Sequence, residues 1–158
     1  MNRTVLSLLL IVFLGMFVSQ SCYAGDGWQF DILISSGNSS NKLTIGQNQT
    51  ASDDNDGFHD VPALLSGDLH AAFTNGGGLL WRDIRALVDG DVKDWLLDVK
   101  SDSGEVITIS WDKNRLPVNT RLALVEVDSG QSVDMNMLSS YSMGNLNGGE
   151  LVIEVSEI

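Results

Sequence analysis

The sequence has little cysteine and little positive charge, and each shortage narrows the range of functions. The only cysteine among the 158 residues is Cys22, so no disulfide can form within the chain. Nine Lys and Arg residues stand against 21 Asp and Glu residues, for a net charge of −12, and no basic cluster occurs. This balance repels phosphate, which argues against nucleic acids and anionic membrane surfaces as partners. An acidic surface favours solubility, while cationic partners and divalent cations remain compatible with it.

The first 24 residues have the three parts of a secretory signal peptide. Arg3 precedes a nearly continuous apolar run, Val5–Val18, and small residues at Cys22 and Ala24 come just before the sequence turns polar. The run has 14 residues, fewer than the ~20 that span a bilayer. We therefore expect cleavage after Ala24, no membrane attachment of the mature protein, and a secreted or periplasmic location. A retained membrane anchor and lipid attachment at Cys22 are the alternatives.

Residues 25–158 are expected to form a single domain. They contain 8 basic and 21 acidic residues, because the expected signal peptide removes Arg3 and no acid. A chain of this length can bury an adequate core without disulfides. An exported domain without cysteine is more typical of bacteria than of small extracellular modules, which usually rely on disulfides.

Short segments of alternating apolar and polar residues run through this domain. Trp28, Phe30, Ile32 and Ile34 share one face of the first segment. Further segments of this kind lie at 42–45, 68–73, 95–100, 105–111, 121–127, 132–137, 139–143 and 151–155. Short strands at intervals of roughly 8–12 residues, separated by Gly, Asn, Asp and Ser, are typical of sandwiches and barrels. The pattern predicts an all-β fold, an antiparallel β-sandwich of about 8–10 strands. The candidates for one short helix are Val61–Leu65 and Asp83–Val88.

Five landmarks spread over the domain carry a resemblance to a known family. They are Ile45-Gly46, the block from Asp56-Gly57-Phe58 to Asp60-Val61-Pro62, the block from Ser110-Trp111-Asp112 to Leu116-Pro117, Val133-Asp134-Met135, and Ser140-Tyr141. Together they resemble a β-sandwich module of bacterial secreted and cell-surface proteins, related to C-terminal secretion-sorting domains. The resemblance implies an immunoglobulin-like or jelly-roll-like sandwich and no enzymatic role. Because the module stands alone here, we expect a small accessory protein.

The acidic segment 52–60 is the first candidate site. Its carboxylates, Asp53, Asp54, Asp56 and Asp60, surround a glycine and could supply oxygens to Ca²⁺. In the helix-loop-helix calcium pattern, however, the closing bidentate acid would fall at Ala63. The alternatives are a calcium loop of another type, which would make the protein a calcium-stabilised structural module of the envelope or extracellular matrix, and a solvated acidic loop.

Catalytic motifs are missing from the sequence. It contains no G-x-S-x-G or H-E-x-x-H pattern, no phosphate-binding glycine loop, and no cysteine nucleophile after Ala24. His59 and His70 each neighbour an aspartate, which is a weak pattern for a transition-metal site. We therefore predict a protein that is not an enzyme, with a small hydrolase as the outside alternative.

Aromatic residues give the second candidate site. Trp28, Trp95 and Trp111 lie on the apolar faces of their strands and are expected in the core. Trp81, between a glycine-rich turn and Arg82, is the best candidate for an exposed aromatic, and Tyr141 is the second candidate ligand-binding residue. We predict an exported binding module that engages a protein partner or a cell-surface polysaccharide through its loops and sheet edges.

Overall fold

The computed structural model describes residues 27–87, 92–143 and 149–158. The expected signal peptide, including Cys22, lies outside the described residues. The strands are β1 (Trp28–Ser36), β2 (Ser39–Gln47), β3 (Val61–Pro62), β4 (Leu69–Asn75), β5 (Gly78–Arg85), β6 (Lys93–Ser101), β7 (Ile107–Trp111), β8 (Thr120–Glu126), β9 (Ser132–Asp134), β10 (Ser140–Met143) and β11 (Gly149–Glu157). The only helical element in these ranges is a single 3₁₀ turn, η1 (Lys113–Arg115). The predicted all-β fold is confirmed.

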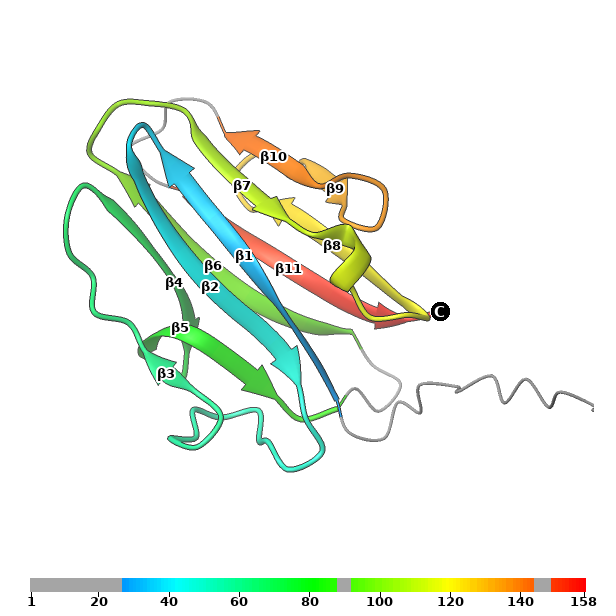
Figure 1. The fold of residues 1–158 in the computed structure, drawn as a ribbon. Coiled ribbons are helices and arrows are strands. Elements are labelled where there is room, and N and C mark those ends of the chain that lie inside the picture. The colour runs from blue at the N-terminus through cyan, green and yellow to red at the C-terminus, as the bar shows by residue number, and fades with distance from the viewer. Residues whose placement is uncertain (1–26, 88–91, 144–148) are drawn as a thin grey trace, which may run out of the picture.

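The eleven strands form one hydrogen-bonded sheet, in the order β10-β7-β1-β2-β5-β4-β6-β11-β8-β9, with β3 added beside β5. The sheet curls over itself, so that β1 and β2 lie in front of β6 and β11 in Figure 1. The expected antiparallel pairing holds for every described pair except β2 and β5, which run parallel. The result is a nearly barrel-shaped sheet rather than two clearly separate layers.

The segment 135–139 explains how the sheet comes close to closing. It runs from β9 to β10, which are the two ends of the strand order. The backbone N–H of Met135 donates to the carbonyl of Leu122 on β8, and the N–H of Trp111 on β7 donates to Ser139. The Trp111 indole also donates to the carbonyl of Met135 over 2.9 Å. One short segment therefore joins both ends of the sheet.

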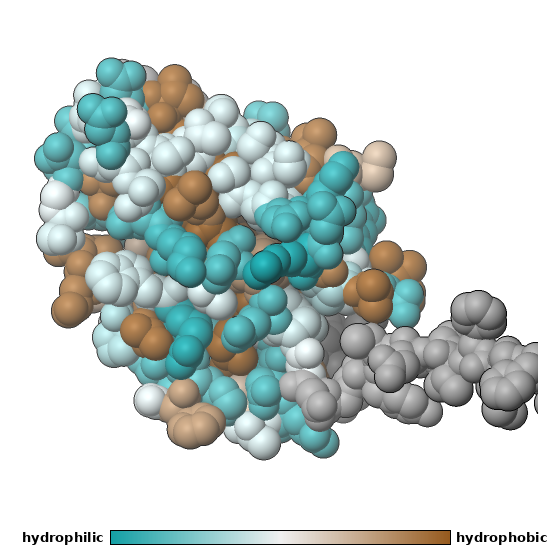
Figure 2. Space-filling model, in the orientation of Figure 1, coloured by the Kyte–Doolittle hydropathy of each residue, from teal (hydrophilic) through white to brown (hydrophobic). Residues whose placement is uncertain are grey.

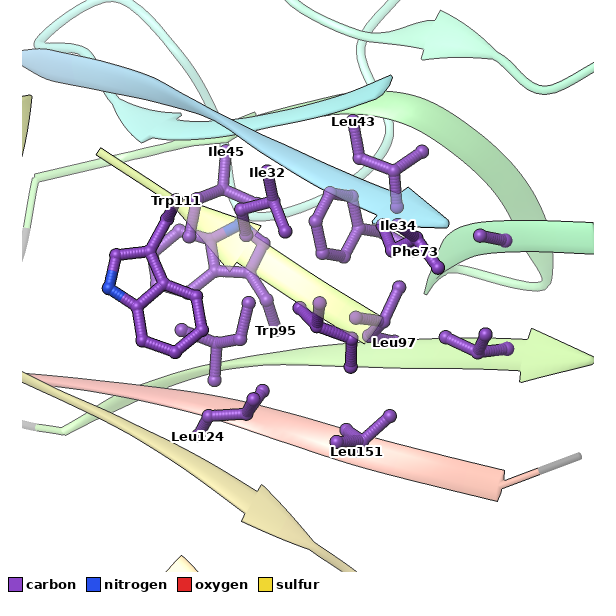
Figure 3. Close-up of a cluster of buried hydrophobic side chains, with 14 of the residues drawn as sticks. Ile32, Ile34, Leu43, Ile45, Phe73, Trp95, Leu97, Trp111, Leu124 and Leu151 are labelled. Carbon is purple, nitrogen blue, oxygen red and sulfur yellow. The ribbon is translucent and has the colours of Figure 1, made fainter. Parts of the chain in front are cut away.

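Alternation along the strands builds the core. On β1, Phe30, Ile32 and Ile34 are buried, whereas Asp31 and Leu33 are exposed. Figure 3 shows side chains from several strands meeting between the two halves of the sheet, with Trp95 and Phe73 among the largest of the fully buried ones. Burial of a side chain of this size contributes roughly 1.5–3 kcal/mol to folding. The core forms without disulfides, as the single cysteine requires.

Neither candidate helix forms. Val61–Pro62 is strand β3, and Asp83 to Arg85 is the end of β5, while Val88 lies outside the described residues. The backbone groups of these segments bond to neighbouring strands, because β5 lies between β2, β3 and β4. The sheet partner therefore decides their conformation, against a local pattern that is compatible with a helical turn.

Candidate functional site

A cleft of about 530 Å³ opens where β1 begins and where β2 and β5 end. The loop between β2 and β3 forms its outer wall and lies beside the ends of these strands in Figure 1. Its lining residues are Gly27, Trp28, Gln29, Gln47, Asn48, Phe58, His59, Arg82 and Ile84. The volume is within the range of about 300–1,000 Å³ that is common for small-ligand sites.

Trp28 and Gln47 form a fixed floor. They are register partners on β1 and β2, and the Trp28 indole N–H donates to Gln47 Oε1 over 2.8 Å. The Gln47 amide nitrogen in turn donates to the carbonyl of Ala86. The Trp28 ring stacks on Phe30, with 5.8 Å between centroids, and lies 6.0 Å from the ring of Trp95. These contacts hold the indole in one orientation before any ligand arrives.

Gly46 permits the close approach of β1 and β2 beneath this floor. A Cβ atom at Gly46 would lie 2.2 Å from the carbonyl oxygen of Trp28 and 2.8 Å from the Cβ of Gln29. Any larger residue would push the two strands apart, since both neighbouring atoms belong to the first part of β1. The position of Trp28 therefore depends on glycine at residue 46.

The opposite wall contains Phe58 and His59. The Phe58 side chain is 84% exposed, and its ring meets the His59 ring edge-on, with 4.9 Å between centroids. His59 Nε2 shares a hydrogen bond with the Thr50 hydroxyl. Arg82 on β5 donates from Nε to the carbonyl of His59 over 2.7 Å and from Nη2 to the carbonyl of Phe58 over 3.4 Å. Arg82 therefore fixes the wall while lining the cleft itself.

The carboxylates of Asp56 and Asp60 stabilise the loop between β2 and β3 by accepting hydrogen bonds from backbone N–H groups. Asp60 is buried, and it accepts the backbone N–H groups of Ile84 and Asp56. Asp56 accepts the N–H groups of Ser52 and His59. These two hydrogen bonds lower the pKa of Asp56, whereas burial raises the pKa of Asp60. Asp56, a predicted calcium ligand, thus binds the backbone of its own loop, and Asp60, another, binds the backbone of that loop and of β5.

The lining of the cleft contains no Asp or Glu, although the chain has 21 of them. Arg82 is its one Lys or Arg residue. In the described part of the chain, no carboxylate oxygen lies within 4.0 Å of Arg82. Arg85, three residues along β5, differs, because it forms an ion pair of 2.8 Å with the fully buried Asp83. Arg82 is therefore the one charged Lys or Arg side chain that lines the cleft, and among the described residues it has no carboxylate partner within 4.0 Å.

The remaining predicted metal ligands lie apart. Asp53 pairs with Lys93, and Asp54 is exposed. The His70 ring hydrogen-bonds the carbonyl of Gly67, so it does not share partners with His59. Among the described residues, no group of three or more His, Cys, Asp or Glu side chains is arranged to hold a metal ion. Calcium binding at residues 53–60 stays a prediction.

The two predicted ligand-binding aromatics lie outside this cleft. Trp81 is half-buried and packs against the core, and its indole nitrogen is buried without a hydrogen-bond partner. Tyr141 is half-buried and donates its hydroxyl proton to Glu126 over 3.3 Å. Burial and the neighbouring Glu126 carboxylate raise the pKa of Tyr141. Their role in binding stays a prediction, with less free surface on each than on Phe58.

Sequence reasoning missed the cleft itself. The sequence pattern predicts Trp28 in the core and gives Arg82 only as the neighbour of Trp81. The parallel pairing of Thr44–Gln47 with Arg82–Arg85 brings the parts together. The signal in the sequence is Phe58, an aromatic residue within a polar segment.

Comparisons with known proteins found no counterpart: no protein-family model matches the chain, and neither the curated proteins nor the solved structures gave a match. The resemblance to bacterial secretion-sorting and immunoglobulin-like modules therefore stays a prediction. Within the described ranges, no helix has the length and hydrophobicity needed to span a membrane.

Proposed function

We propose that this protein is an exported, non-enzymatic binding module that recognises a cell-surface polymer through the cleft of Trp28, Phe58 and Arg82. The observation that carries the proposal is the combination of a preformed floor with a protruding, 84% exposed phenylalanine. An aromatic ring held in the open at the rim of a cleft offers a flat apolar surface at little entropic cost. The finer immunoglobulin-like assignment and the secreted or periplasmic location belong to the same proposal.

A polysaccharide fits this site better than a protein partner. The apolar residues on the face shown in Figure 2 lie in small separate groups among hydrophilic ones, rather than in one large patch. Stable protein interfaces usually need a contiguous, largely apolar centre. The cleft instead combines aromatic rings with the exposed amide side chain of Gln29. Sugars match both features, because their C–H faces pack on aromatic rings and their hydroxyl groups form hydrogen bonds with amides.

The composition of the lining also supports a binding role over hydrolysis. Acid–base and glycosidase chemistry generally require one or two carboxyl groups facing the substrate. The lining supplies none, and it contains no serine or cysteine nucleophile. His59 is the one lining residue with acid–base chemistry, and its Nε2 already bonds to Thr50.

The test is binding of the purified protein to an array of immobilised cell-surface polysaccharides and envelope proteins. We expect polysaccharide binding that Phe58→Ala weakens by about tenfold, the loss of one good aromatic contact. Leu64→Ala is the matched control, because Leu64 is 74% exposed and lies outside the cleft. Binding confined to envelope proteins would favour a protein partner. Equal affinity of both variants for the same ligand would refute the assignment of the cleft as the binding site.

A further inference from the structure

Arg82 retains donors that the protein does not use. A guanidinium carries five N–H donors in a planar fork. Among the described residues, its acceptors are the carbonyl oxygens of His59 and Phe58, reached from Nε and Nη2. Neutral carbonyls leave the positive charge uncompensated, and no described carboxylate lies within 4.0 Å. A half-buried cation of this kind favours an anionic ligand.

Arg85 on the same strand has a carboxylate partner, which Arg82 lacks among the described residues. Arg85 lies on the same strand and gives three hydrogen bonds to the carboxylate of Asp83. Arg82 faces a lining without acids, on a chain with a net charge of −12. An acidic protein repels anions over most of its surface, so a local cation in an acid-free cleft is a selective place for one.

We propose that the ligand is an acidic saccharide whose uronic acid carboxylate binds Arg82 while a sugar ring packs against Phe58. This inference rests on the proposed function and adds the substrate class. Arginine matches carboxylate oxygens with paired N–H donors. The 530 Å³ cleft accommodates about one or two sugar rings between Phe58 and the Trp28 floor.

A peptide carboxylate is the competing source of the same charge. Peptides commonly bind by adding a strand, which requires free backbone groups. Near Arg82 these groups are already used: the N–H of Ile84 donates to Asp60, and the N–H of Asn48 donates to the carbonyl of Arg85. A ligand at Arg82 therefore meets side chains, which favours a saccharide.

Calorimetric titration with matched probes tests the inference. The acidic probes are oligosaccharides of galacturonate, glucuronate, mannuronate and guluronate, and the neutral probes are their carboxyl-reduced counterparts of equal length. A short peptide with a free C-terminal carboxylate is the third arm. We expect at least one uronate to bind tenfold more tightly than its neutral counterpart, with Arg82→Gln abolishing this preference. Arg121→Gln, which removes an exposed arginine outside the cleft, should leave the preference within twofold.

The ratio of the affinities for the acidic and the neutral oligosaccharides shows whether Arg82 contacts the ligand or only stabilises the cleft. If Arg82 only positioned Phe58 and His59, then Arg82→Gln would weaken both probes equally and the inference would fail. Equal binding of acidic and neutral probes, both lost in Phe58→Ala, would overturn the inference while the proposed function stood. Binding of the peptide alone, or of none of the four uronates, would also overturn it.

Discussion

At the scale of single residues, Asp83 and Arg85 form an ion pair at the edge of the core. Asp83 is fully buried, and its carboxylate accepts hydrogen bonds from Arg85 and Asn75. The Arg85 guanidinium also lies 5.2 Å from the centroid of the Trp95 ring. Removal of the arginine would leave an uncompensated charge next to the core.

We therefore predict that Arg85→Met lowers the free energy of unfolding by about 3–5 kcal/mol. Arg121→Met is the control, because Arg121 is exposed, and it should change stability by less than about 0.5 kcal/mol. Urea unfolding followed by tryptophan fluorescence measures both. Equal midpoints for the two variants would show that the ion pair of Asp83 and Arg85 does not stabilise the fold.

Asp56 gives a pH-dependent prediction. Its folded-state pKa lies below the ordinary value, because the carboxylate accepts backbone N–H groups of Ser52 and His59. The stability it contributes is therefore complete above its unfolded pKa of about 3.9 and is lost as the pH falls through the folded pKa. Asp60, whose folded pKa is raised by burial, contributes in the opposite direction, so stability falls as the pH rises from 3.9 through that folded pKa.

Asp56→Asn should accordingly be less stable than the parent at pH 7, and the difference should shrink toward pH 3. The measurement is the urea midpoint of both proteins at the two pH values. A difference of the same size at pH 3 would mean that the charge of Asp56 plays no part in holding the loop.

At the scale of elements, the junction of β1 and β2 sets the floor of the cleft. Gly46→Ala places a methyl group 2.2 Å from the Trp28 carbonyl oxygen. We expect a loss of about 1–3 kcal/mol in stability, the usual effect of overpacking. Gly57→Ala is the control, since nothing lies within 4 Å of its added Cβ. Thermal melting of both variants measures the effect, and equal midpoints would contradict the close approach.

Some strands of the fold can be predicted from the sequence alone, and others cannot. Buried and less buried residues alternate from Phe30 to Ser36 in β1, from Trp95 to Ser101 in β6, throughout β7 and from Leu151 to Ser156 in β11, so their period of two is visible in the sequence. β5 has no such period, because Leu80, Asp83 and Ile84 are buried together. A buried aspartate also reads as a surface residue until its partner, Arg85, is known.

The candidate site was harder to predict than the fold for a related reason. Phe58 and Arg82 are brought together by the pairing of β3 with β5, in which Val61 lies opposite Arg82, and by hydrogen bonds from the Arg82 side chain to loop carbonyls. Neither kind of contact leaves a local pattern in the sequence. The acidic residues around Phe58 predict a calcium site, whereas in the structure two of them, Asp56 and Asp60, accept backbone N–H groups.

At the scale of the whole molecule, the calcium hypothesis can be tested by comparing the melting temperature in calcium with that in chelator. A ligand that binds only the native state raises the melting temperature by mass action. A calcium site at residues 53–60 therefore predicts a higher midpoint in excess Ca²⁺ than in chelator, whereas a loop held only by the backbone donors of Asp56 and Asp60 and by the pairing of Asp53 with Lys93 predicts equal midpoints. A rise in calcium that Asp54→Asn or Asp56→Asn removes would instead establish the acidic loop as a calcium site.

The proposed function depends on the cleft being the recognition surface. The four tryptophans, Trp28, Trp81, Trp95 and Trp111, report on this directly, because each indole N–H gives its own signal in a ¹H–¹⁵N spectrum. On titration with the strongest polysaccharide from the array, we predict the largest shift at Trp28, with Trp81 and Trp111 nearly unchanged. A shift centred on Trp81, with the Trp28 signal unchanged, would place the binding surface elsewhere and contradict the proposed function.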